Sequence, residues 1–303
     1  MRHGKYPFVI GFLIAPVALY VIYVIGPFIQ AFQIALTNWK GLGAPLFVGI
    51  DNFKKLLTND DVFWKAAEHN LWALIVLPLV TIAIALFLAF MLNVGGRTSG
   101  GATAGVWGSK FYRVVFFLPQ VLAVPIIGVL FQAILRPDRS GMVNGPLSAL
   151  GIAPVGFLTD VHVAFWTVLG VATWQAVGFY VVLFSAGMAS IPAELYEAAQ
   201  IDGATRIVMF FRVTIPLLFD TIQVAWVYLG IAAFDLFALV QVLTVEQGGP
   251  DGATTVLSVE IYRNLVQYSK YGYASAMGVC LFFMTLTFAA LIMRTTRREN
   301  IEF

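Results

Sequence analysis

The sequence predicts an all-α polytopic membrane protein in which six transmembrane helices form a single domain over residues 1–303. Composition is the first observation: 60% of the residues are hydrophobic and 11% are charged, against roughly 25% charged in soluble domains. The second is that six apolar stretches reach the roughly 20 residues that a helix needs to cross a bilayer. The expected spans are about 8–32, 70–93, 114–135, 163–188, 217–242 and 272–293. The net charge of +2, without a long basic run, gives no reason to expect a nucleic-acid partner.

The first span carries two local signals. Arg2 and Lys5 precede it, as in the basic region of a signal peptide, but its apolar stretch far exceeds the usual core of about 7–15 residues. We therefore expect an uncleaved anchor. Gly26 and Pro27 predict that the helix bends or ends there. After this span, segment 34–68 is expected to hold a short amphipathic helix on the outer membrane surface, with Asp51 or Asn52 as its N-cap.

Motifs for catalysis and nucleotide binding are missing from the sequence. A Walker A loop needs GxxxxGK followed by Ser or Thr, but in the glycine-rich segment 95–110 Lys110 follows Ser109. Three scattered histidines and the single Cys280 form no metal-binding pair. We therefore expect a protein that is not an enzyme and that holds no cofactor of its own.

Basic residues predict the orientation of the spans. Three clusters adjoin span ends on the side that holds both termini: Arg2 and Lys5, Lys110 and Arg113, and Arg294 with Arg297 and Arg298. Because cytoplasmic loops carry an excess of Lys and Arg, both termini are predicted to be cytoplasmic.

The segment between the fourth and fifth spans, residues 190–216, is predicted to form two short helices joined by a bend, which we call the foot. Ser190 is a candidate N-cap for the first helix, and Pro192 suits its first turn. Gly203 supplies a left-handed turn that ends this helix, and Thr205 can cap the second. An ordinary interfacial linker would share this pattern, so periodicity alone leaves both interpretations open.

Three short motifs in the foot add a resemblance. Glu197-Ala198-Ala199, Asp202-Gly203-Ala204 and Ile215-Pro216-Leu217 closely resemble the EAA loop of ABC importer permeases, a coupling helix that docks on a cytoplasmic ATPase subunit. The resemblance implies the fold of a type I ABC importer permease. It also implies a set of ATPase-docking residues: Glu194, Glu197, Ala198, Ala199, Asp202, Gly203 and Ala204.

The rest of the chain is similar to one branch of that family, the sugar permeases of the maltose and glycerol-3-phosphate type. The segments FVGIDNFKKLL and SGMVN resemble its first two outer loops. Leu243-Thr244 and Gly248-Gly249-Pro250 resemble its outer LTxGGP turn, with two extra residues between the halves. The opening MRHGKYPF is similar to amino-sugar or chito-oligosaccharide importers.

The resemblance also implies partners. A sugar-type permease works with a second, related permease subunit as a heterodimer, with two cytoplasmic ATPase subunits that bind the ATP, and with an extracytoplasmic sugar-binding protein. A carbohydrate is the expected substrate, and lipid surrounds the spans. A secondary transporter for a small polar solute is the alternative, but it would be expected to show duplicated halves and several acids within the spans. A membrane-embedded hydrolase is disfavoured by the missing catalytic motifs.

Candidate substrate-contacting residues are polar or aromatic groups within the spans. Asp235 is the one formal charge well inside an expected span, and intramembrane acids usually face a cavity or a partner. A structural hydrogen-bonding role for Asp235 is the alternative. The other candidates can equally join helices or mark interfaces: Gln120, Trp174, Gln175 and Tyr180.

Overall fold

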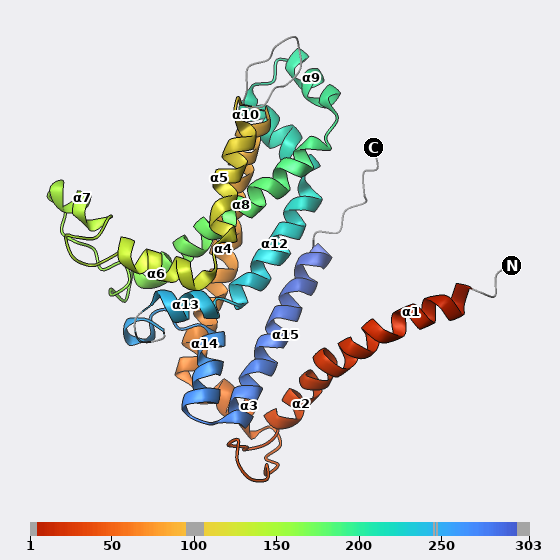
Figure 1. The fold of residues 1–303 in the computed structure, drawn as a ribbon, viewed down its shortest axis with the longest axis vertical. Coiled ribbons are helices and arrows are strands. Elements are labelled where there is room, and N and C mark those ends of the chain that lie inside the picture. The colour runs from red at the N-terminus through yellow and green to blue at the C-terminus, as the bar shows by residue number, and fades with distance from the viewer. Residues whose placement is uncertain (1–4, 95–105, 245, 247, 296–303) are drawn as a thin grey trace. The chain divides into compact units, whose positions relative to one another are not determined.

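The structure, a computed structural model, describes residues 5–94, 106–244, 246 and 248–295 (Figure 1). Within these residues the named elements are helices, and Thr37 and Phe47 form an isolated β-bridge. Most of the glycine-rich segment 95–110 lies outside these residues. The chain divides into two compact units, Met1–Trp64 with Glu260–Met284 and Lys65–Val259 with Thr285–Phe303.

The helices follow one another with few long connections. Their bounds are α1 Lys5–Tyr20, η1 Val21–Ile25, α2 Gly26–Ala35, α3 Asp51–Thr58, α4 Asp61–Val94, α5 Ser109–Val121, α6 Val124–Ile134, α7 Asn144–Ala149, α8 Ala164–Ala189, α9 Ala193–Ile201, α10 Arg206–Met209, η2 Phe210–Thr214, α11 Ile215–Leu217, α12 Phe219–Phe234, α13 Phe237–Leu243, η4 Pro250–Gly252, α14 Leu257–Tyr262, η5 Arg263–Gln267 and α15 Tyr271–Thr295.

Helices long and apolar enough to cross a membrane come in two kinds within the described residues. Four are single helices: Val9–Ala35, Asp61–Asn93, Ala164–Ala189 and Tyr271–Arg294. Two are bent pairs, Ser109–Val121 with Val124–Ile134 at 98° and Arg206–Leu217 with Phe219–Phe234 at 73°. If each bent pair counts as one span, there are up to six.

In the first unit, α1, η1 and α2 form one continuous helix. The sequence predicts a bend or an end at Gly26 and Pro27, but the helix passes through a π-helical turn at Val21–Ile25 instead. Pro27 has no N–H to donate to the preceding turn, and the wider turn accommodates that loss. Phe32 in α2 packs edge-on against Phe282 and Phe283 of α15, with ring centroids 6.2 and 5.9 Å apart.

The short helix α3 corrects the predicted cap. Its N-cap is Ile50, without a side-chain cap, and neither Asp51 nor Asn52 caps it because both already lie inside the helix. The Asn52 amide instead donates to the carbonyl oxygens of Ala35 and Thr37, at 2.8 and 2.7 Å. These oxygens lie at the carboxyl end of α2, where backbone acceptors lack helical partners, so Asn52 fastens α3 to α2.

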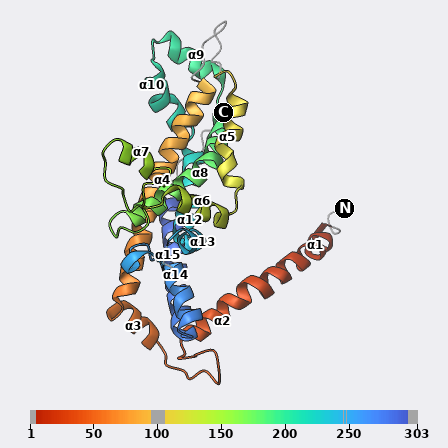
Figure 2. The same ribbon diagram turned by 60° about the vertical axis from the view of Figure 1, so that its left-hand side comes forward.

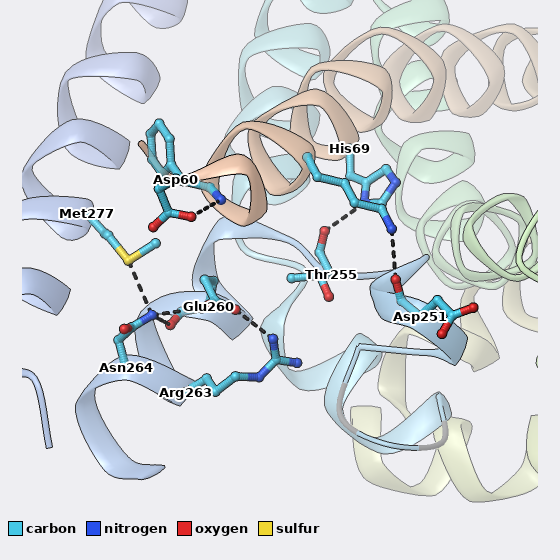
Figure 3. Close-up of polar contacts among 10 residues, drawn as sticks. Asp60, His69, Asp251, Thr255, Glu260, Arg263, Asn264 and Met277 are labelled. Atoms are coloured by element: carbon cyan, nitrogen blue, oxygen red, sulfur yellow. Dashed lines mark hydrogen bonds and ion pairs between the residues drawn. The ribbon is translucent and has the colours of Figure 1, made fainter. Parts of the chain in front are cut away.

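A buried acid, Glu260, lies within α14 (Figure 3). Glu260 is 5% exposed, pairs with Arg263 at 2.7 Å and accepts from the Asn264 amide at 2.8 Å. Burial raises the pKa of Glu260, and the charge of Arg263 opposes that rise. Elsewhere in the unit the Tyr273 hydroxyl donates to Asp60.

In the second unit, α4, α5, α8 and α12 pack around a common core (Figure 2). The closest approach joins α5 to α8 at Gly178, where a Cβ atom would lie 1.8 Å from the Phe116 carbonyl oxygen. After the bend between α5 and α6, α6 packs on α13. The Gln132 side chain of α6 donates to the Val242 carbonyl at 2.6 Å, and a Cβ atom on Gly128 would lie 2.6 Å from Val242 Cγ1.

Candidate substrate cavity and docking foot

A cavity of about 300 Å³ lies where two helices of the second unit are interrupted. Its lining is mostly apolar but includes a group of polar side chains, and we call it the polar cavity. Four of the five predicted substrate residues line it together: Gln120, Gln175, Tyr180 and Asp235. They come from three different helical segments, α5, α8 and the junction of α12 with α13. The structure therefore brings together side chains that are up to 115 positions apart in the sequence.

The first interruption separates α5 from α6. Leu122 and Ala123 have extended backbones, with ψ of 135° and 139°, and α6 then begins at Val124. Pro125 explains the break, because proline lacks an N–H and its ring clashes with the carbonyl four residues earlier in a continuous helix. The predicted span 114–135 is therefore two helices, and Gln120 lies just before the turn.

The second interruption corrects the view of Asp235 as a residue inside a continuous span. Asp235 ends α12 with φ −111° and ψ 56°, and α13 begins only at Phe237. Its N–H donates to the Ala232 carbonyl at 3.0 Å. The break frees backbone groups beside the cavity, as in discontinuous helices that line transport sites. Neither glycine nor proline marks this break in the sequence.

Trp174 does not join the other candidates. It lines a separate, apolar cavity of about 850 Å³ between α4, α5 and α8, and its ring packs 5.0 Å from that of Phe131. Neighbouring residues on a helix point about 100° apart, so Trp174 and Gln175 face different cavities.

The polar cavity can form hydrogen bonds and offer an aromatic face. The carboxylate of Asp235 accepts, the two glutamine amides both donate and accept, and the rings of Phe179 and Tyr180 border the same space. A hydroxyl-rich molecule needs both kinds of contact, because its hydroxyls need partners and its C–H faces pack on rings. The volume lies at the small end of the range for ligand sites, about 300–1,000 Å³.

The foot has the predicted two-helix form. It lies at one end of α4, α5 and α8, with α9 and α10 as its helices (Figures 1 and 2). Gly203 has φ +79° after the end of α9, and the Thr205 side chain accepts from the Val208 N–H at 3.4 Å. Ser190 does not cap α9, since its hydroxyl donates to the Gly187 carbonyl of α8 and Pro192 is the N-cap.

Buried contacts hold the foot together and join it to α4. Tyr196 is 3% exposed, and its hydroxyl is 3.1 Å from Thr214 Oγ1 in η2. Burial raises the pKa of Tyr196, and the Thr214 hydrogen bond partly opposes this. Phe210 packs on Phe90 of α4, with ring centroids 4.9 Å apart. Tyr196 also belongs to the buried core of the second unit, so one side of α9 packs against that core.

The other side of the foot is exposed. Glu194, Ala198 and Asp202 are exposed, whereas Glu197 is half-buried. Ile201 is 87% exposed, which is unusual for a large aliphatic side chain and leaves it available for a partner. The surface thus combines carboxylates with an apolar residue.

Asn70 in α4 is a further buried polar residue that is not among the candidates predicted from the sequence. Its side chain is fully buried, donates to the Ala233 carbonyl and accepts from the Leu257 N–H, both at 2.8 Å. The available signal was an amide side chain at the start of an apolar stretch of more than 20 residues, where a buried polar group must find partners.

Comparison with known proteins agrees with this geometry. Residues 93–298 match the family of binding-protein-dependent transport system inner membrane components. The chain belongs to this family. It is therefore a membrane transport component rather than an enzyme, with the helical architecture of ABC importer permeases.

Individual members of the family are similar along almost the whole chain. The diacetylchitobiose uptake system permease protein NgcF of Streptomyces coelicolor is 40% identical over 98% of this chain and 84% of its own length. The multiple sugar-binding transport system permease protein MsmF of Streptococcus mutans is 31% identical, over 96% and 95%. Among solved structures, a bacterial alginate ABC transporter in complex with alginate pentasaccharide-bound periplasmic protein matches at a TM-score of 0.80 and 26% identity, covering 96% and 94%.

Proposed function

We propose that this chain is a permease subunit of an ATP-driven, binding-protein-dependent importer for amino-sugar oligosaccharides of the diacetylchitobiose type. The observation that carries the substrate is the 40% identity to the diacetylchitobiose permease over 98% of the chain. The cavity with Asp235, two glutamines and a tyrosine supports it, because such a site offers partners to hydroxyl and acetamido groups.

The proposal includes the rest of the assembly. A second, related permease completes the pore, two ATPase subunits bind the ATP, and an extracytoplasmic sugar-binding protein delivers the substrate. The exposed carboxylates and Ile201 of the foot are suited to a partner surface with a basic side chain beside an apolar groove. ATP hydrolysis then moves the foot, and the foot transmits that movement to the helices that line the cavity.

The first experiment tests transport itself. The complete complex, in proteoliposomes that contain ATP, should take up labelled diacetylchitobiose in preference to maltose and alginate oligosaccharides. Uptake should stop when the ATPase subunits are omitted. Uptake that persists without them and follows an ion gradient would instead identify a secondary transporter, and uptake of another sugar would move the substrate class.

The second experiment tests the cavity. Asp235→Ala should lower the rate of uptake at least tenfold, because it removes the only formal charge among the cavity's lining residues. Asp138→Ala is the control, since Asp138 is exposed in the loop after α6 and pairs with Arg136. If both variants assemble and transport equally well, Asp235 does not contribute to the substrate path.

The third experiment tests orientation, for which we propose that both termini and the foot are cytoplasmic. In a Cys280→Ser background, a membrane-impermeant maleimide should label Asn59→Cys in intact cells and spare Thr205→Cys. Labelling of the cysteine at 205 from outside would reverse the orientation.

A further inference from the structure

One face of α4 holds the turn at residues 248–257, which we call the clamped turn. Lys65 Nζ donates to the Asp251 carbonyl at 2.8 Å, and His69 Nδ1 is 2.7 Å from the Thr255 carbonyl oxygen (Figure 3). The His69 ring also stacks on Phe165 at 4.6 Å. Asn70 adds the bond from the Leu257 N–H. Three side chains within six positions of one helix therefore bind the backbone of a single turn.

Asn70 differs from the other two because it also reaches the helix break. Its amide donates to the carbonyl oxygen of Ala233, two residues before Asp235. At a helix end the last four carbonyls lack intrahelical partners, and here Asp235 itself satisfies only the Ala232 carbonyl. The Leu257 N–H at the start of α14 is likewise one of the first N–H groups of a helix, which also lack such partners. One buried side chain thus serves two helix ends.

The direction of both bonds fixes what can replace this residue. The Leu257 N–H requires an acceptor, and the Ala233 carbonyl requires a donor, so the site needs an amide in one orientation. Asparagine is fully buried here, and water is therefore not available to replace either bond. An aspartate retains the acceptor, and while it is protonated, as burial beside a carbonyl oxygen favours, it also retains a donor. Once alkaline pH ionises it, the donor is lost and only the link to the helix break is broken.

We propose that Asn70 is a positioning residue for transport, which ties the clamped turn to the break at Asp235 and so fixes how Asp235 faces the polar cavity. This inference rests on the proposed function. If the sugar-binding protein docks against the clamped turn and moves it, that movement reaches the cavity through this amide. His69 and Lys65 hold the turn without contacting the break.

The test separates positioning of the break from retention of the turn. In a Cys280→Ser background, Ala238→Cys places a thiol on an exposed, cavity-lining position of α13. Its rate of modification by a small water-soluble thiosulfonate is measured in the purified complex with Asn70 intact, with Asn70→Asp and with His69→Gln. All rates are compared at one alkaline pH, at which the aspartate is ionised. We expect Asn70→Asp to change the rate at least fivefold there, and His69→Gln to leave it within twofold.

Uptake kinetics, measured without the cysteine, provide the readout that a purely structural role would not alter. At the same alkaline pH, Asn70→Asp should lower kcat for diacetylchitobiose uptake at least tenfold with little change in the KM for the loaded binding protein. Its effect should also be smaller than additive with that of Asp235→Asn, because both act at one site. Failure of the intact complex to transport this sugar would refute the proposed substrate, whereas the thiol-modification rates would still decide the role of Asn70.

Two results would overturn the inference. One is a modification rate at position 238 within twofold of that with Asn70 intact. The other is an equal change in Asn70→Asp and His69→Gln, since that would leave only retention of the turn. If Asn70→Asp does not assemble, Asn70→Gln decides: its longer amide displaces the carbonyl that it holds, so the rate must change at least threefold, and an unchanged rate refutes the proposal.

Discussion

The foot and the clamped turn are both irregular connections of the second unit, yet they are held in opposite ways. The foot is attached through buried contacts on one side, around Tyr196 and Phe210, and leaves Glu194 and Ile201 exposed on the other. In the clamped turn, Thr254 and Val256 are fully buried, and α4 binds three of its backbone groups. The foot therefore presents side chains on the surface, whereas the clamped turn is joined to α4 through its own backbone.

The largest effect is expected from reversing a charge on the foot. Glu197→Lys should reduce retention of the ATPase during purification by roughly 30-fold or more, because loss of one member of a partly desolvated charge pair costs about 2–5 kcal/mol. Glu68→Lys makes the same change on an exposed part of α4 and should retain the ATPase. Equal retention of the ATPase in both variants would mean that the exposed surface of the foot does not bind it.

Backbone strain at the bend of the foot should have the next largest effect. Gly203 has φ +79° with open space where a Cβ would lie, so Gly203→Val costs only the left-handed conformation, about 1–2 kcal/mol. We expect a five- to 30-fold weaker ATPase attachment. Gly151 is a matched control, with φ +81° and equally open space in the loop after α7. If Gly151→Val weakens attachment as much, the strain acts on the whole protein and not on the foot.

Removing the buried hydrogen bond of Tyr196 in the foot should have a smaller effect, and that effect is on stability. Tyr196→Phe leaves the buried Thr214 hydroxyl without this partner and should lower the free energy of unfolding by about 1 kcal/mol. The raised pKa of Tyr196 means that the folded state favours its protonated form. Its contribution is therefore complete below the unfolded pKa, near 10, and is lost as the pH rises from there through the folded pKa. Thermal unfolding in detergent should show the difference between wild type and variant shrinking above that pH.

The smallest effect is expected at the exposed end of the clamp. Lys65→Met removes the bond to the Asp251 carbonyl but keeps an aliphatic side chain, and should cost about 0.5 kcal/mol because solvent can replace the bond. Thermal unfolding of this variant beside His69→Gln would measure how strongly each residue holds the turn. A larger loss in Lys65→Met would mean that the turn is held mainly at its exposed end.

The same contrast explains what the sequence could predict. The foot was predictable because its signals are local. Gly203 adopts the left-handed conformation that glycine favours, and Thr205, two residues later, caps the helix that follows it directly. The contacts of the clamped turn were not predictable, because Asn70 also bonds a carbonyl 163 positions away in the sequence. The break at Asp235 lacks glycine and proline, so hydropathy extends the span straight through it. Four cavity residues were among the polar and aromatic groups selected from the sequence. Trp174 was selected on the same grounds but faces another cavity, because residue type does not give direction.

The contact at Gly178 has a mechanical consequence. At Gly178 the backbone of α8 lies directly against the Phe116 carbonyl of α5, so no side chain separates the two helices at this point. Sliding either helix along the other would drive the next side chain of α8 into that backbone. We therefore expect the two helices to move as one unit, so that a displacement of the foot would also displace the bend that follows α5.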